Sequence, residues 1–179
     1  MKTNLNKLDS HADFRHNGRM SLVIRKAEAR DASLIFSFIR ELAEYERLAH
    51  EVDATEVDIA KALFGADPRV FADIAEWEGE PVGFALWFYN FSTFRGRHGM
   101  YLEDLYVRPE FRSKGIGKAL LQHLARRCLA EGLPRLEWWV LDWNEPALRF
   151  YRSIGAIPMD EWTVQRVTGE ALNNLAEAP

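Results

Sequence analysis

Gly115 and Gly117 lie between a strand-like run and a helical pattern over residues 115–130. A glycine-rich turn at the start of a helix presents backbone N–H groups and the positive end of the helix dipole to an anion. The spacing fits neither of two common phosphate loops, because a Walker A loop needs glycine at Arg112 and the dinucleotide fingerprint needs glycine at Leu120. The segment therefore predicts an anion-binding loop of another kind, with an ordinary turn containing two glycines as the alternative.

The strand-like run before this loop, residues 99–107, changes its hydrophobic phase part-way. Apolar side chains occupy even positions up to Leu102 and odd positions from Leu105 onward. A one-residue slip exchanges the two faces of a strand unless an extra residue is inserted as a β-bulge. We therefore predict a bulge at Glu103-Asp104 that leaves backbone groups unpaired, which suits a ligand slot. A plain edge strand with two exposed acids is the alternative.

A third segment combines a possible helix cap with a possible proton donor. Asn144 can cap the helix predicted over residues 145–154, with Pro146 in its first turn. Tyr151 lies two helical turns along, on the same face as Asn144. A tyrosine hydroxyl beside a ligand can donate a proton. An amphipathic tyrosine in the core is the alternative.

No set of residues has the spacing of a metal site. The single cysteine, Cys128, cannot form an intrachain disulfide and lies on the apolar face of the helix over 115–130, where a buried thiol is inert. The 5 histidines lack a ligand spacing such as His-x-x-x-His, and the chain has no CxxC motif. We expect chemistry that needs no metal.

Length and composition bound the class of protein. The chain has 179 residues, 47% of them hydrophobic, which is enough to bury a sizeable core in one domain. The net charge is −4 without a basic stripe, which argues against a nucleic-acid partner. No run approaches the ~18 apolar residues of a membrane span, and the N-terminus lacks the apolar core of a secretory signal. We expect a cytoplasmic enzyme or binding module without a membrane partner.

The elements that position these residues follow a mixed pattern. Residues 1–19 are polar and without hydrophobic period, which predicts a flexible tail, or a short ordered arm on a partner; residues 20–179 are expected to form a single domain. The apolar periods and turn residues predict strands over 22–26, 70–78, 82–91, 99–107, 135–142 and 162–168, and helices after Asp31, over 55–64, 115–130 and 145–154, and after 168. A meander of hairpins followed by alternating elements indicates an α/β fold with a mixed sheet, not a doubly wound parallel one.

Together these segments resemble the GNAT acetyltransferase superfamily over roughly residues 21–168. The loop matches its Arg-x-x-Gly-x-Gly motif, the phase-slipped strand matches its bulged strand, and Asn144 with Phe150-Tyr151 matches its second cofactor motif. The resemblance implies a central mixed sheet of six to seven strands flanked by about four helices, with acetyl-CoA as co-substrate. The residues it implies for cofactor binding are Leu105, Tyr106, Val107, Arg112, Ser113, Lys114, Gly115, Ile116, Gly117, Lys118 and Asn144.

The segments Glu41-Leu42-Ala43-x-Tyr45-Glu46, Tyr101-Leu102-Glu103-Asp104 and Trp143-Asn144-Glu145-Pro146 look like those of spermidine/spermine (diamine) acetyltransferases. This closer resemblance implies that Tyr151 is the general acid and that Glu103 is the base, directly or through water. It implies that Tyr45, Glu46 and Asp104 lie near the amine, and that the protein is a homodimer. Residues 157–162 depart from the polyamine enzymes, because that segment is short and carries Pro158 in place of an acid-rich insert.

The expected function is acetyl-CoA-dependent N-acetyl transfer to the primary amine of a small polyamine- or diamine-like molecule, directly in a ternary complex. A backbone N–H near Leu105 is the expected donor to the tetrahedral oxyanion. Because the subfamily includes enzymes for thialysine and other small amines, the acceptor stays open. The alternatives are another amine, including a protein N-terminus or lysine, and a non-catalytic acetyl-CoA sensor.

Overall fold

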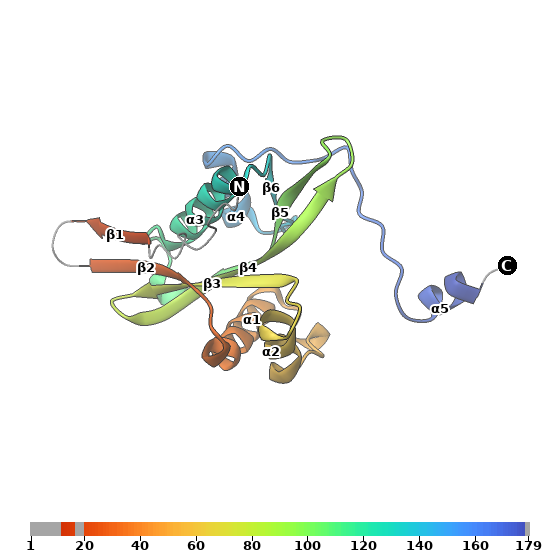
Figure 1. The fold of residues 1–179 in the computed structure, drawn as a ribbon, viewed down its shortest axis with the longest axis horizontal. Coiled ribbons are helices and arrows are strands. Elements are labelled where there is room, and N and C mark those ends of the chain that lie inside the picture. Colours follow the sequence, from red (N-terminus) through yellow and green to blue (C-terminus); the bar gives the residue numbers. More distant parts are fainter. Residues whose placement is uncertain (1–11, 17–19, 178–179) are drawn as a thin grey trace, which may run out of the picture. The chain divides into compact units, whose positions relative to one another are not determined.

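The computed structural model describes residues 12–16 and 20–177 (Figure 1). Contacts divide the chain into two compact units, Met1–Trp139 and Val140–Pro179. The first unit holds the β-sheet, and the second holds the helices α4 (Glu145–Ser153) and α5 (Gly169–Glu177). The expectation of one domain over residues 20–179 stays a prediction.

The described residues form a mixed six-stranded sheet in the order β1-β2-β3-β4-β5-β6. All neighbouring strands are antiparallel except β5 and β6, which are parallel. The expected mixed α/β fold is therefore confirmed. The strands are β1 (Ala12–His16), β2 (Met20–Lys26), β3 (Val70–Trp77), β4 (Glu80–Ser92), β5 (Arg97–Val107) and β6 (Leu136–Glu137).

The hairpin between β3 and β4 turns through Glu78 and Gly79. Both residues have positive φ angles, 54° and 84°, and the flanking residues Trp77 and Glu80 pair with each other. A two-residue turn with two positive φ angles follows the right-handed twist of the strands. The hairpin expected between the strands over 70–78 and 82–91 is confirmed.

Helices cover both faces of the sheet in the first unit. Figure 1 shows α1 (Ala32–Glu46) and α2 (Glu56–Phe64) on one face and α3 (Ile116–Glu131) on the other. Phe38 of α1 stacks on Phe84 of β4 with ring centres 5.5 Å apart, in a cluster that also buries Tyr106. On the opposite face Cys128 is buried against Met100, as expected of an inert core thiol. Each of these helices buries its apolar side against the sheet.

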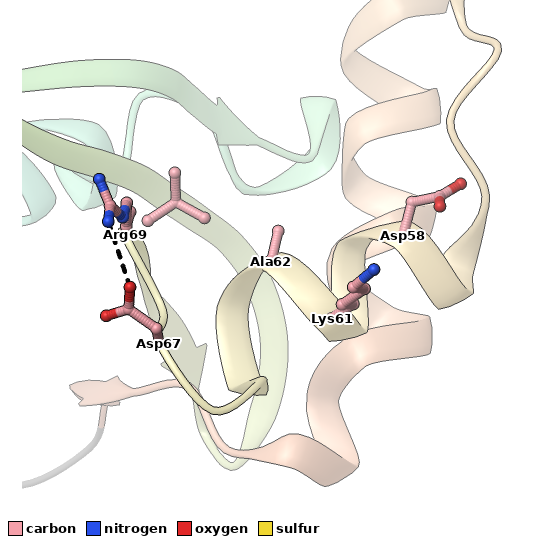
Figure 2. Close-up of a pocket in the computed structure, with 6 residues that line it drawn as sticks. Asp58, Lys61, Ala62, Asp67 and Arg69 are labelled. Atoms are coloured by element: carbon pink, nitrogen blue, oxygen red, sulfur yellow. Dashed lines mark hydrogen bonds and ion pairs between the residues drawn. The ribbon is translucent and has the colours of Figure 1, made fainter.

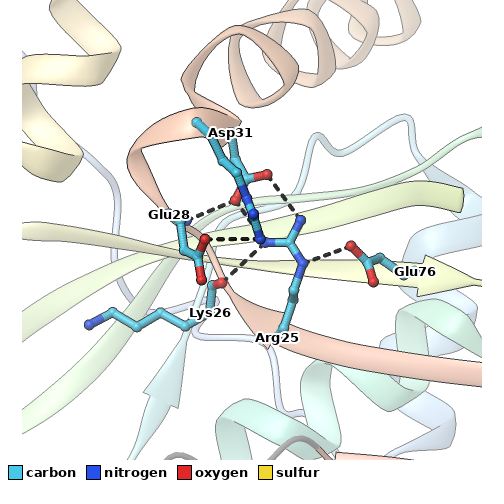
Figure 3. A network of polar contacts seen from close by, with 6 residues as sticks. Arg25, Lys26, Glu28, Asp31 and Glu76 are labelled. Carbon is cyan, nitrogen blue, oxygen red and sulfur yellow. Dashed lines mark hydrogen bonds and ion pairs between the residues drawn. The ribbon is translucent and has the colours of Figure 1, made fainter. Parts of the chain in front are cut away.

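A polar network fixes the start of α1 (Figure 3). The Arg25 guanidinium donates to both carboxylate oxygens of Asp31, at 2.7 and 3.0 Å, and to Glu76 at 2.7 Å. Asp31 also accepts the backbone N–H of Glu28 at 2.8 Å. Burial alone would raise the pKa of Asp31, but these hydrogen bonds and the charge of Arg25 lower it. The charged form of Asp31 therefore anchors to the sheet the helix that carries Tyr45 and Glu46.

Three local expectations need correction or completion. Residues 12–16 of the expected tail form β1, while residues 1–11 and 17–19 lie outside the described residues. The strand expected over 135–142 is confined to Leu136–Glu137. Residues 162–168 carry no strand, and their side chains are exposed. An alternating apolar pattern needs a neighbouring strand to become a sheet edge, and the second unit contains none among its described residues.

Candidate active site

The predicted bulge is present in β5. Leu102 pairs with Trp87 and Asp104 pairs with Leu86, so Glu103 is an extra residue without a cross-strand partner. Residues directly opposite each other share a face of the sheet. Leu102 therefore lies with Trp87, whose ring contacts Arg127 of α3. Asp104 lies with Leu86, which belongs to the core cluster under α1.

Two other carboxyl groups around the bulge act on Asp104. Asp104 is partly buried, Glu103 is exposed, and Glu46 ends α1. Burial, with the negative charges of Glu103 and Glu46, raises the pKa of Asp104 to about 7. Burial also raises the pKa of Glu46. Within the described residues no hydrogen bond or ion pair joins Asp104 to a cation, so this acid is available to a cationic ligand or to a proton near neutral pH.

The backbone of the glycine-rich loop turns sharply before α3. Ser113 and Gly115 both have positive φ angles, 62° and 81°. A Cβ added at Gly117 would meet only a methyl group of Val107, 4.0 Å away. The first turn of α3 therefore faces open space at Gly117, as an approaching anion requires.

The cations of this loop are held by aromatic rings and by the backbone. The Arg112 Nε donates to the carbonyl of Val107 at 2.9 Å, and its guanidinium lies 4.4 Å from the centre of the Tyr45 ring. The Lys114 ammonium lies 4.9 Å from the ring of Phe111 and 5.2 Å from that of Trp77. Cation–π contacts of this kind fix the loop while leaving positive charge at its surface. The structure thus brings together Arg112 and Tyr45, which the family resemblance relates to different ligands.

The outer edge of β5 is open beyond its first residues. The register of β6 covers Met100 and Tyr101 of β5. No strand of the described residues pairs with that edge along Leu105, Tyr106 and Val107. The carbonyl of Val107 already accepts from Arg112, and the remaining unpaired backbone groups of this edge can hydrogen-bond an extended ligand.

Asn144 and Tyr151 belong to the second unit. The Asn144 side chain accepts the backbone N–H of Ala147 at 3.4 Å, so it caps α4 as predicted. Tyr151 is half-buried on α4, and its ring centre lies 5.4 Å from that of Phe150. The bulge and the loop belong to the first unit. The roles of Asn144 and Tyr151 in catalysis stay predictions.

Arg108 supports the site but has no signal in the sequence. Its guanidinium donates to both oxygens of Glu41 on α1, at 2.9 and 3.1 Å, and lies 4.9 Å from the centre of the Phe38 ring. The pair joins the end of β5 to α1. Since the partners are far apart in the chain and lie on different elements, only the tertiary structure shows the contact.

An open pocket lies elsewhere, between α2 and the start of β3 (Figure 2). Lys61 and Asp58 project from α2, and Arg69 pairs with Asp67 at 3.2 Å. Its two acids and two bases balance, and none of the predicted site residues lines it. The pocket is therefore separate from the bulge and the loop.

Residues 12–16 and 20–177 hold neither a candidate metal centre nor a membrane-spanning helix. No group of three or more His, Cys, Asp or Glu side chains could hold a metal ion there. Among the same residues, no helix has the length and apolar character needed to cross a bilayer.

Comparison with known proteins decides the family. The model of the acetyltransferase (GNAT) family matches residues 35–156. The chain belongs to the GNAT family. A thialysine N-epsilon-acetyltransferase from Bos taurus is 39% identical over 166 residues, which cover 87% of this chain and 97% of that protein. An L-ornithine N5-acetyltransferase from Arabidopsis thaliana is 31% identical, covering 86% of this chain and 87% of that protein.

A solved structure shares the fold. An integron cassette protein from the mobile metagenome of V. cholerae superposes with a TM-score of 0.73 and 31% identity, covering 88% of this chain and 98% of that one. The GNAT fold and the N-acetyltransferase class expected from the sequence are confirmed.

Proposed function

We propose that this GNAT enzyme moves an acetyl group from acetyl-CoA to the terminal primary amine of a small polyamine- or diamine-like substrate, by direct transfer in a ternary complex. The observation that carries the proposal is the group of carboxyls Glu46, Glu103 and Asp104 around the bulge. Negative charge in a partly desolvated setting attracts an ammonium group. The names of the two similar enzymes, which specify thialysine and ornithine, support a small amine as acceptor.

The residues of the loop fit the anionic end of acetyl-CoA. The open space at Gly117 and the left-handed backbone at Gly115 leave main-chain N–H groups of the first turn of α3 free to approach a pyrophosphate. When bound, acetyl-CoA supplies the activated acetyl group. The cofactor-binding residues are proposed to be Leu105, Tyr106 and Val107 on the open strand edge, Arg112, Ser113, Lys114, Gly115, Ile116, Gly117 and Lys118 in the loop, and Asn144.

The ammonium proton of the substrate is proposed to be removed at the bulge. An alkyl ammonium has a pKa near ~10, so only about one molecule in a thousand is neutral at pH 7. Glu103 is proposed to take the ammonium proton, directly or through water, while Tyr45, Glu46 and Asp104 hold the amine. A backbone N–H near Leu105 is proposed to donate to the oxyanion. Tyr151 is proposed to protonate the departing thiolate.

Assembly as a homodimer is part of the proposal. Trp143 and Trp162 are 51% and 72% exposed, which is aromatic surface that a second copy would cover. Light scattering at micromolar concentration tests this directly. A dimer mass is expected, and a monomer mass would contradict it.

The acceptor class is tested with purified protein, acetyl-CoA and a panel of amines, with release of free thiol as the signal and product mass as the check. The panel holds diamines, polyamines, thialysine, ornithine, and peptides with a free N-terminus or lysine. Turnover is expected with small diamine-like molecules. Turnover with peptides alone would favour a protein substrate, and binding of acetyl-CoA without turnover of any amine would favour a sensor.

A further inference from the structure

Phe88, Tyr101 and Trp139 form a continuous aromatic group, called here the aromatic triad. Phe88 and Tyr101 are cross-strand partners on β4 and β5, with ring centres 5.0 Å apart. Trp139, just beyond β6, meets Tyr101 edge to face at 5.8 Å. The Trp139 side chain is 60% exposed, and the other two are partly exposed. The triad therefore offers aromatic surface that the core does not use.

The bulge places this triad on the same face as Asp104. Leu86 and Phe88 lie two residues apart on β4 and so point to one face. Their partners on β5 are Asp104 and Tyr101, which therefore share that face as well. Two residues of a strand span ~7 Å. This is the reach of a chain of a few methylene groups.

Charge on this face favours cations. The pKa of Tyr101 is raised, chiefly by burial and then by the negative charges of Glu103 and Glu137. Arg135 offsets Glu137, which it contacts at 3.0 Å and which also accepts a hydrogen bond from Asn90 at 2.7 Å. The net negative charge therefore lies on the bulge side of the triad. Aromatic faces add an attraction for a cation that needs no counter-ion.

We propose that the aromatic triad binds the methylene chain and the distal cation of the amine, while the carboxyls around the bulge hold its reacting end. The proposal rests on the function proposed above and assigns residues to the far end of its substrate. The enzyme selects amines that carry a second positive charge a few carbon atoms from the first. Trp139, as the most exposed ring, contributes most to that selection.

The test compares 1,4-diaminobutane with n-butylamine, which have the same chain and reacting amine. With saturating acetyl-CoA, the wild-type KM for the diamine is expected to be at least tenfold lower. Trp139→Ala raises the diamine KM at least fivefold and leaves the butylamine KM within twofold. Trp139→Phe keeps most of the preference. Phe94→Ala removes a ring that is 94% exposed outside the triad, and leaves both values unchanged.

Calorimetry with 1,4-diaminobutane, without acetyl-CoA, gives a readout independent of turnover. Weaker diamine binding by Trp139→Ala, with unchanged binding by Phe94→Ala, supports the triad. If no amine is acetylated, only the proposed function is removed, and this binding result still supports the triad. The opposite case is that the wild type acetylates amines while Trp139→Ala changes the KM values for the diamine and for butylamine equally, or changes neither. Either result overturns the triad and leaves the proposed function standing. Circular dichroism confirms that the variants are folded.

Discussion

The guanidinium of Arg112 lies over the ring of Tyr45, 4.4 Å from its centre, and joins the glycine-rich loop to the last turn of α1. The same arginine is tied to the end of β5 through the carbonyl of Val107. Next to Tyr45 is Glu46, one of the carboxyls that act on Asp104. The loop proposed for the cofactor and the acids proposed for the amine are therefore held by one set of contacts.

The loop assignment predicts a specific loss of acetyl-CoA binding in Gly117→Asp. The new carboxylate stands where the pyrophosphate approaches the backbone, so affinity should fall more than tenfold, at least ~1.4 kcal/mol. Gly117→Ala is the matched control, because its Cβ meets only a methyl group at 4.0 Å. Calorimetry on folded protein measures both. Equal affinity of wild type and Gly117→Asp would remove the loop from the cofactor site.

The general-acid assignment predicts that Tyr151→Phe lowers kcat by ~10²–10⁴, nearer the lower end because water can partly replace the hydroxyl at a thiolate leaving group. The KM for acetyl-CoA should change little, because the hydroxyl acts mainly in the transition state. Rates at saturating amine are measured from pH 6 to 10. A kcat within a few-fold of wild type at every pH would leave Tyr151 as a packing residue only.

The raised pKa of Asp104 predicts a pH-dependent stability. Since its carboxyl has a pKa of about 7 when folded and ~3.9 when unfolded, the folded state binds the proton more tightly. Its contribution to stability is present below pH 4 and is lost as the pH rises to about 7. Asp104→Asn should therefore raise Tm by at least ~2–4 °C at pH 8 and by less at pH 5, a shift that corresponds to about 1 kcal/mol.

Asp160→Asn, at an exposed position, is the control for this effect and should leave Tm unchanged at both pH values. Thermal unfolding followed by circular dichroism gives the four comparisons. A Tm gain for Asp104→Asn that is the same at pH 5 and pH 8 would show that burial and neighbouring charge do not hold the proton on this carboxyl.

A buried hydrogen bond in the sheet predicts a pure stability effect. Trp87 Nε1 donates to Asp73 at 2.8 Å, and Asp73 is 1% exposed. Trp87→Phe leaves this carboxylate short of a donor, so the free energy of unfolding should fall by ~1–3 kcal/mol. Urea unfolding measures the change, with Trp162→Phe, 72% exposed, as the control. Equal stability of Trp87→Phe and wild type would show that this hydrogen bond does not stabilise the fold.

Most elements of the first unit, including the bulge, could be predicted because their signals are local. The phase change at Glu103-Asp104 is visible in neighbouring residues, and so is the turn segment Glu78-Gly79-Glu80-Pro81 between two strand-like runs. β1 carries only a short alternation of apolar and polar residues over residues 12–15, and its pairing with β2 makes it a strand. Residues 162–168 have the alternating pattern of a strand but form none, because no neighbouring strand among the described residues pairs with them.

The features of the candidate site also fall into those that the sequence could predict and those that it could not. Gly115, Gly117 and Asp104 could be found from spacing and resemblance, which report backbone shape and local order. The ion pair of Arg108 with Glu41 and the ring contact of Tyr101 with Trp139 could not, because each joins residues distant in the chain. Contacts of this kind depend on the register of the sheet and the placement of α1, which local patterns do not encode.

The pairing of β4 with β5 does not need Glu103, which has no cross-strand partner. Trp87 and Leu86 are consecutive on β4, and their partners on β5 are Leu102 and Asp104. Deleting Glu103 would make those partners consecutive as well and would remove the bulge from the β4–β5 pairing. Each remaining side chain of β5 would keep its side of the sheet, since Leu102 and Asp104 already face opposite ways. Removing Leu102 would instead take a buried side chain from the core. The core therefore does not set the length of β5, and the extra residue serves the irregular backbone of the bulge instead of the packing.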